Sequence, residues 1–320
     1  MKSLADIFPA PDHSELLRRL RRPDGPADVI LDTDTYNEID DQFALSYLVR
    51  SREQLRIRAL TAAPFWRDPS TGILRSETPG DGMEKSYREI FKVLKLLGAE
   101  ELSSLVYRGS DRYLPEENIP VDSPAARAMA EISREYSPEH PLYILGIAAG
   151  TNIASALLLD PSMAERVVIV WLGGHAQHYG GCDEFNMKQD LKAARVIYGS
   201  GAAVVQLPCM GVVSEFRFTR PELEYRFRDK NPLCNYLIDS TYEYAKLKFR
   251  YEDWSKPLWD VTAVAWALGG DNMLMRTIPS PIPQDDRTYG QDPNRHPIGY
   301  VYYIRKDPIA ADLTEKLTQK

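Results

Sequence analysis

The hydrophobic positions of this chain form short aliphatic runs that alternate with stretches of helical spacing. Five runs, at residues 29–31, 55–60, 143–145, 167–172 and 203–207, are bounded by Gly, Pro or Asp, as is typical of buried strands. Helical spacing follows them, for example at Ala44, Leu45 and Leu48, and again after Asn152, a candidate N-cap. Strands that alternate with helices predict an α/β fold: a doubly wound, mainly parallel central sheet with helices on both faces.

Beyond Pro208 the pattern becomes looser and more aromatic. We expect a helical, aromatic-rich C-terminal region near the site, with residues 210–258 as a possible lid, an irregular excursion at 280–297 and a late strand at 298–304. The first 25 residues predict a surface extension that carries a short amphipathic helix. Because no internal repeat or low-complexity linker interrupts the chain, we expect a single domain over residues 1–320.

Composition narrows the class of partner. The net charge of −7 and the sequence pI near 5.4 argue against general affinity for nucleic acid or anionic membranes, which depends on concentrated Lys and Arg. No apolar stretch is long enough for a membrane span, and the start of the chain lacks the apolar core of a signal peptide. The three cysteines are scattered and have no CxxC spacing, which favours a reducing compartment. We therefore expect a cytoplasmic protein with a small-molecule partner.

Acidic residues crowd the loop after the first predicted strand, where Asp32, Asp34, Asp40 and Asp41 occur with Glu38. In a parallel sheet this loop lies at the carboxyl edge, where ligands usually bind. A hard divalent cation would relieve the mutual repulsion of these carboxylates. The alternative interpretation is structural, with Asp40 or Asp41 capping a helix that starts near Gln42.

Three further segments occur in a recognisable order after this loop. They are Leu145-Gly-Ile-Ala-Ala-Gly-Thr-Asn-Ile153, Trp171-Leu-Gly-Gly174 followed by Glu184-Phe-Asn186, and Leu258-Trp-Asp-Val-Thr-Ala-Val-Ala265. Together with the acidic loop, this order and spacing resemble the nucleoside hydrolase family, the inosine-uridine preferring type and its relatives, from about residue 28 to residue 268. Four motifs in order are far more specific than an isolated Asp-x-Asp.

The resemblance implies a calcium-dependent hydrolase of ribonucleosides or related N-ribosides, commonly a homodimer or homotetramer. It implies calcium ligation by Asp34, Asp41, the carbonyl of Thr151 and Asp260. It also implies that Asp34 is the general base that takes a proton from an attacking water, whose pKa the ion lowers. Asp40, Glu184 and Asn186 would bind the sugar hydroxyls, and Asp32 would orient the loop. A negatively charged site suits an oxocarbenium-like transition state.

Two features depart from the family pattern. Five residues, 35–39, separate Asp34 from Asp40 where well-known members have a shorter Pro-Gly link, so Asn37 or Glu38 is expected to point into the pocket. Trp259 stands where those members carry a histidine associated with protonation of the leaving base; a tryptophan can stack on a base but cannot protonate it.

Other side chains are candidates for the aglycone end of the pocket. Two histidines in the loop before Glu184, His175 and His178, are alternative proton donors, and we expect His178 to contact substrate; each also fits an ordinary surface position. Phe65, Trp66 and Tyr179 fit either pocket walls or partly buried loop residues.

Two other functions fit parts of the sequence. In a haloacid-dehalogenase-type phosphatase, Asp32 would be the nucleophile and Asp34 the acid/base, with magnesium as cofactor, but Asp40, Asp41 and Glu184 would then have no role. In a non-catalytic binder, the same pocket would hold a nucleoside or ribose without cleaving it, which the replacement of histidine by Trp259 favours. The sequence does not identify the base.

Overall fold

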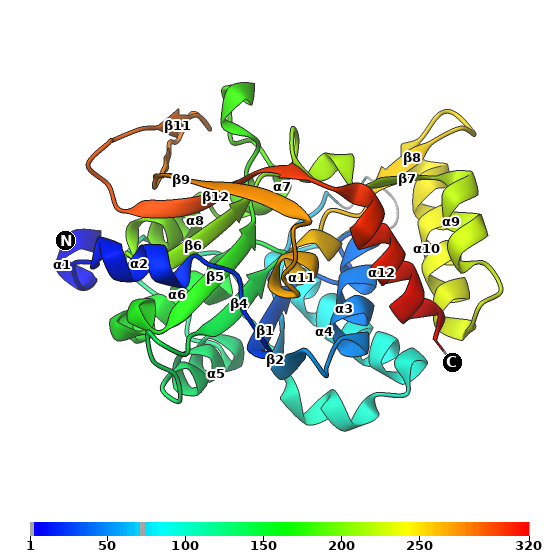
Figure 1. Ribbon diagram of the computed structural model, residues 1–320, viewed down its shortest axis with the longest axis horizontal. Helices are drawn as coiled ribbons and strands as arrows, with labels where there is room; N and C mark the ends of the chain where they lie inside the picture. The colour runs from blue at the N-terminus through cyan, green and yellow to red at the C-terminus, as the bar shows by residue number, and fades with distance from the viewer. Residues whose placement is uncertain (1–2, 69, 71–73, 320) are drawn as a thin grey trace.

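An eight-stranded sheet forms the centre of the computed structural model, which describes residues 3–68, 70 and 74–319 (Figure 1). Neighbouring strands are parallel except at one edge, where β9 runs antiparallel to β12. From edge to edge the order is β3 (Val106–Arg108), β2 (Leu55–Ala62), β1 (Ala27–Thr33), β4 (Leu142–Gly146), β5 (Val167–Leu172), β6 (Ala203–Leu207), β12 (Pro297–Ile304) and β9 (Met273–Pro279). Because β1 and β4 are adjacent, the chain order reverses between them, as in doubly wound sheets.

Successive residues of the central strands enter two different cores. In β1, Val29 and Leu31 join one core and Ile30 joins the other, because side chains alternate across a strand. The first core packs against α3 (Asp40–Arg50), α4 (Pro79–Leu97), α11 (Val261–Ala267) and α12 (Lys306–Thr318). The second packs against α5 (Pro124–Ser133), α6 (Thr151–Leu159) and α8 (Leu191–Gly199). Helices therefore cover both faces, and the predicted fold class is confirmed (Figure 1).

The predicted strands all lie within observed ones, and the late strand at 298–304 is β12. The pattern missed β3 and β9, since β3 is short and β9 is an edge strand with exposed Arg276 and Thr277. Within the excursion at 280–297, β10 (Ile282–Pro283) and β11 (Tyr289–Gly290) form a small antiparallel pair. Short 3-10 helices span Glu100–Leu105, Pro161–Glu165, Gln177–Tyr179 and Val213–Glu215.

Two expectations about helix starts were wrong. The N-cap of α3 is Ile39, which makes no side-chain cap, so neither Asp40 nor Asp41 is there to cap the helix. The N-cap of α6 is Gly150 rather than Asn152, whose side chain turns into the protein instead. All three polar residues that were candidate caps, Asp40, Asp41 and Asn152, are therefore available for other contacts.

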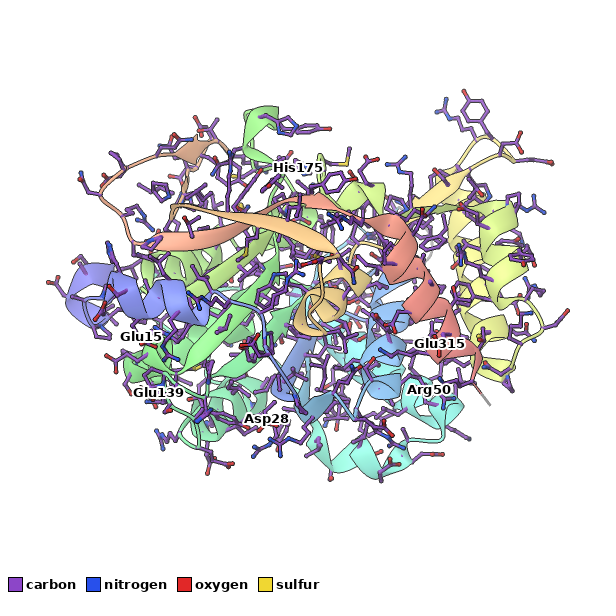
Figure 2. All side chains as sticks on the ribbon, in the orientation of Figure 1. Glu15, Asp28, Arg50, Glu139, His175 and Glu315 are labelled. Atoms are coloured by element: carbon purple, nitrogen blue, oxygen red, sulfur yellow. The ribbon has the colours of Figure 1, made fainter. Side chains whose placement is uncertain are left out.

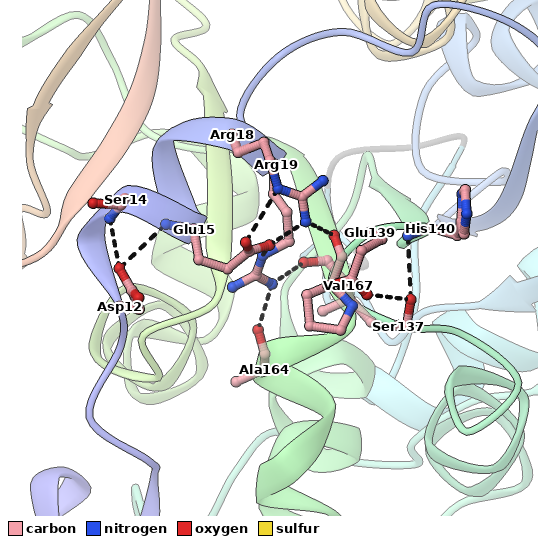
Figure 3. Close-up of polar contacts among 11 residues, drawn as sticks. Asp12, Ser14, Glu15, Arg18, Arg19, Ser137, Glu139, His140, Ala164 and Val167 are labelled. Carbon is pink, nitrogen blue, oxygen red and sulfur yellow. Dashed lines mark hydrogen bonds and ion pairs between the residues drawn. The ribbon is translucent and has the colours of Figure 1, made fainter.

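The N-terminal segment forms α1 (Leu4–Ile7) and α2 (His13–Arg19), and α2 is the predicted short helix. It is anchored at the edge of the sheet where β5 begins. Leu16 is fully buried, and the Arg19 guanidinium donates to the carbonyls of Ala164 and Val167 at 2.9 and 3.2 Å. The neighbouring Arg18 donates to the Pro138 carbonyl and pairs with Glu15 (Figure 3).

The aromatic C-terminal region contains α9 (Arg220–Phe227) and α10 (Pro232–Lys248), flanked by the antiparallel pair β7 (Arg217–Thr219) and β8 (Ser255–Pro257). Phe249 and Trp254 stack with ring centroids 5.7 Å apart. In the described part of the chain, no helix combines the length and hydropathy that a membrane crossing needs.

Candidate active site

A cavity of about 190 Å³ lies at the edge where the parallel strands end. Figure 2 shows this edge at the top, with His175 after β5, and the opposite edge at the bottom, with Asp28 in β1. The side chains around the cavity come from the acidic loop, from the segments after β4, β5 and β6, and from the start of α11. They are Asp34, Asn37, Glu38, Asp40, Asp41, Ile147, Leu172, His175, Asp183, Glu184, Phe185, Asn186, Cys209, Met210, Trp259 and Asp260.

Three aspartates from distant parts of the chain form the acidic centre of this cavity. Carboxylate oxygens of Asp40, Asp41 and Asp260 lie within 4.8 Å of one another, and all three side chains are buried. Thr33 donates its hydroxyl hydrogen to Asp41 Oδ1 at 2.5 Å, which holds that carboxylate in place. The first turn of α3 thus meets the first turn of α11, because the two helices pack side by side.

Asp34 lines the same cavity and is 1% exposed, yet its Oδ2 atom has no hydrogen-bond partner among the residues that the structure describes. Burial and the Asp41 charge raise its pKa, while Arg67 opposes them. Burial and the Asp40 charge raise the pKa of Asp41 to about 7, and burial with the Asp40 and Asp41 charges raises that of Asp260. A buried carboxylate without a donor is costly, so this cluster fits a hard, oxygen-loving cation such as calcium.

Asp32 lies behind the cavity rather than among the residues described as lining it. Its Oδ1 atom accepts hydrogen bonds from Thr61 Oγ1 at 2.7 Å and from Asn152 Nδ2 at 2.8 Å. Asn152 in turn accepts from the backbone N–H and the hydroxyl of Ser110. Asp32 therefore joins the end of β1 to β2 and α6, which suits the loop-orienting role expected for it and leaves it poorly placed as a phosphatase nucleophile.

The segment expected to bind the sugar folds as α7 (Phe185–Gln189). Glu184 is its N-cap, and its carboxylate accepts from the backbone N–H groups of Gly174, Asn186 and Met187 at 2.9 to 3.0 Å. The Asn186 amide donates to the Leu172 carbonyl at 3.0 Å. Both side chains line the cavity, so the fold presents them together with Asp40.

Besides Asp32, two expected site residues lie outside the described cavity lining. Thr151 begins α6, is fully buried and donates its hydroxyl hydrogen to Asp190 at 2.7 Å. His178 packs against Tyr179, with ring centroids 5.0 Å apart. The histidine that lines the cavity is His175, whose Nδ1 accepts from the Met210 backbone N–H at 3.3 Å. The geometry therefore favours His175 over His178 as a ligand contact.

Of the three aromatic residues considered as pocket walls, none is among the described lining residues. Phe65 is fully buried, whereas Trp66 and Tyr179 are exposed. Gln189 bonds to Trp66 in both directions, accepting from its backbone N–H and donating to its carbonyl. Phe185 and Trp259 are the aromatic side chains of the lining instead.

Sequence reasoning missed two cations beside the cavity. The Lys256 ammonium contacts Glu38 at 2.8 Å and Asp40 at 3.2 Å, and Arg67 donates to Asn37 at 3.1 Å and lies 3.4 Å from Glu38. Burial alone would raise the pKa of Glu38, but Lys256 and Arg67 outweigh it and lower that pKa to about 2. The available signal was a lone lysine at the start of the apolar run that leads into Trp259 and Asp260.

Comparison with solved structures finds the same fold in several proteins. A plant nucleoside hydrolase is 21% identical, with a TM-score of 0.72, over 92% of this chain and 100% of its own. A purine-preferring ribonucleoside hydrolase from Gardnerella vaginalis is 19% identical, with a TM-score of 0.71, over 91% and 98%. The type III effector protein XopQ, complexed with adenosine diphosphate ribose, is 17% identical, with a TM-score of 0.63, over 98% of each chain.

No curated protein matches this sequence. The model of the inosine-uridine preferring nucleoside hydrolase family matches residues 75–301, a stretch that includes the Glu184 and Asp260 segments. The acidic loop lies before this stretch, so its meeting with Asp260 is an observation independent of the match. With most of its length matched and the same fold in structures of nucleoside hydrolases, this chain belongs to the inosine-uridine preferring nucleoside hydrolase family.

Proposed function

We propose that this protein hydrolyses the N-glycosidic bond of ribonucleosides or related N-ribosides in the cavity at the end of the sheet. The observation that carries the proposal is one buried cavity that brings Asp34 together with Asp40, Asp41 and Asp260. Carboxylate oxygens of the last three lie within 4.8 Å of one another, and among the described residues one Asp34 oxygen has no hydrogen-bond partner. Family membership supports the reaction class, and the titles of the plant and Gardnerella neighbours name nucleoside hydrolases.

Asp34, Asp41 and Asp260 are the side chains that would hold a calcium ion, with the Thr151 carbonyl as a further expected ligand. Calcium, when bound, would lower the pKa of a water molecule and attract hydroxyl oxygens. Asp34 is placed to accept the proton that an attacking water loses, because its carboxylate lines the cavity and has an unoccupied oxygen. Asp40, Glu184 and Asn186 would orient the ribose hydroxyls, and Asn37 lies beside them.

Trp259 would bind the aglycone by stacking. Lys256 Nζ lies 3.8 Å from the centroid of the Trp259 ring, and the ring also lines the cavity, where a flat base could stack on it. Since tryptophan donates no useful proton, substrates whose leaving group needs little protonation should react best. We also propose that the protein is cytoplasmic and acts as a homo-oligomer.

Purified protein should be screened against purine, pyrimidine and modified ribosides, with and without a calcium chelator, by measuring free ribose. We expect ribose release that stops on chelation and returns when calcium is restored. Phosphate release from phosphomonoesters that needs magnesium and ignores calcium chelation would support a phosphatase and contradict the proposal.

The second candidate is a nucleoside- or ribose-binding protein without catalysis. The replacement of the family histidine by Trp259 favours it, and the structural neighbour XopQ was solved with adenosine diphosphate ribose. The two candidates separate cleanly in the same screen, because a binder would return intact nucleoside after prolonged incubation with saturating calcium despite measurable affinity.

A further inference from the structure

Lys256 places a positive charge inside the acidic cavity wall. Its side chain is 1% exposed, and the ammonium group contacts Glu38 Oε2 at 2.8 Å, Asp40 Oδ1 at 3.2 Å and the Pro257 carbonyl at 2.9 Å. An ammonium group has three N–H donors, so each has a partner. Burying an unpaired lysine would be costly, and this full set of partners explains how the protein tolerates it.

The ammonium is held from several distant segments. Glu38, its closest partner, also accepts a hydrogen bond from the Tyr244 hydroxyl at 2.8 Å and lies 3.4 Å from Arg67. Glu38 occupies the five-residue link between Asp34 and Asp40, which is longer than in well-known family members. The five-residue link thus carries an acidic residue that pairs with Lys256 and holds its ammonium beside Asp40.

The carboxylates of Asp40 and Asp34 differ in their hydrogen-bond partners. Asp40 has a donor on each oxygen, namely Lys256 on Oδ1 and the Asp260 backbone N–H on Oδ2, at 3.4 Å. Among the described residues, Asp34 has a buried oxygen with no hydrogen-bond partner. The charge of Asp40 is therefore compensated by a direct contact with a cation, whereas Arg67 acts on Asp34 without a hydrogen bond to that oxygen.

We propose that Lys256 is a positioning residue that assigns the clustered carboxylates to different tasks. By fixing and neutralising Asp40, it keeps that side chain for the sugar hydroxyls and leaves the cation to Asp34, Asp41 and Asp260. Without Lys256, Asp40 would be released to act as a further cation ligand, because one of its oxygens lies within 4.8 Å of carboxylate oxygens of Asp41 and Asp260. The inference rests on the proposed function, because it takes the cavity to hold both a cation and a ribose.

The test is a double-mutant cycle read by calcium binding rather than by activity. Metal-stripped wild type, Lys256→Met, Asp40→Asn and the double variant are titrated with calcium in a calorimeter. Removal of the Lys256 charge should tighten calcium binding whether residue 40 is Asp or Asn. When residue 40 is Asp, the same removal also frees a fourth carboxylate to bind calcium. We therefore expect the gain caused by Lys256→Met to be about tenfold larger with Asp40 than with Asn at position 40.

Kinetics give a second readout of the same cycle. With a riboside from the screen, Lys256→Met should raise KM about tenfold or more and change kcat less, since Asp40 leaves the sugar. In the Asp40→Asn background the same substitution should have little further effect on KM. Lys256→Arg keeps a positive charge beside Glu38 and Asp40 and should bind calcium within about threefold of wild type.

Lys306→Met is the matched control, because Lys306 also pairs with a glutamate, Glu222, and lies 4.8 Å from the Phe218 ring centroid, away from the cavity. It should leave calcium affinity unchanged. Equal gains from Lys256→Met in both backgrounds would show a purely through-space charge effect and overturn the inference. If wild type bound no calcium at all, the proposed function would fall first and this inference with it, so the two failures are distinguishable.

Discussion

The ammonium of Lys256 lies over the indole ring of Trp259, with Nζ 3.8 Å from the ring centroid. The position where the family resemblance implies a histidine associated with protonation of the leaving base therefore holds an aromatic ring beside a cation. A cation over an aromatic ring withdraws electron density from it, and this ring lines the cavity. This arrangement suits binding of a flat leaving group better than proton delivery to it.

Trp259→Ala should mainly weaken substrate binding. Stacking of a base on an aromatic ring contributes about 1 to 3 kcal/mol, so we expect KM for purine ribosides to rise by about 5- to 100-fold with a smaller change in kcat. Trp259→Phe, which keeps an aromatic face, is the control and should lie closer to wild type. An unchanged KM in the alanine variant would show that the ring does not bind the aglycone.

Asp34→Ala should abolish turnover, because the substitution removes the proposed base and a cation ligand together. A loss of at least about 1,000-fold in kcat is expected, measured as free ribose at saturating calcium. Asp183→Ala is the control, since Asp183 is an exposed carboxylate on the same cavity wall and pairs with Arg287. Near-normal rates in the Asp34 variant would show that the base is assigned wrongly.

The cation-free protein should lose stability as pH rises. Folding raises the pKa of both Asp41 and Asp32 from 3.8 to about 7, so the folded state binds more protons than the unfolded state between these values. The contribution of these two carboxyl groups to folding stability is therefore fully present below about pH 4 and is lost progressively up to about pH 7. In chelator, Tm should be lower at pH 8 than at pH 5.5 by at least about 5 °C.

Calcium should shrink this pH dependence, because its charge compensates the carboxylates that folding brings together. Asp34→Asn and Asp41→Asn should each raise the Tm of the chelated protein at pH 8, since each removes a buried negative charge. Added calcium should also raise the Tm of both variants by less than it raises the Tm of wild type. A chelated wild type whose Tm is the same at both pH values would contradict the idea that buried carboxylates repel one another here.

His175→Ala should reduce kcat/KM more than His178→Ala. His175 lines the cavity, and burial lowers its pKa, so the ring is neutral at pH 7 with Nδ1 accepting from Met210 and the proton on Nε2. Loss of one neutral hydrogen bond corresponds to about a five- to tenfold decrease. Activity lost on raising pH above 7 in wild type, and no longer lost in His175→Ala, would instead identify an imidazolium acid.

Asn152→Ala should destabilise the fold by about 3 kcal/mol without touching the cavity directly. It removes a donor to the buried Asp32 carboxylate and leaves the Ser110 backbone N–H, 2.8 Å away, without its acceptor. Urea denaturation in chelator measures the change. Asn235→Ala, which removes an acceptor from the more exposed Asp229 N–H, is the control and should cost less than about 1 kcal/mol.

Much of this protein could be predicted from its sequence, because the features involved are local. Short aliphatic runs bounded by Gly, Pro or Asp identified the sheet strands at 29–31, 143–145 and 167–172, because strands of a parallel sheet are buried on both faces. The acidic loop after β1 could be recognised for the same reason, because every loop that follows a parallel strand emerges at the carboxyl edge.

The tertiary structure decided what no local pattern encodes. Lys256 meets Glu38 and Asp40 across separations of 218 and 216 residues, and Asn152 bonds to Asp32 across 120. Whether a buried polar group caps a helix, neutralises a neighbour or lacks a partner depends on which distant segments pack around it, as the different fates of Asp40 and Asp34 show. Sequence periodicity carries the layout of the sheet, whereas electrostatic pairing inside the site exists only after the chain has closed around it.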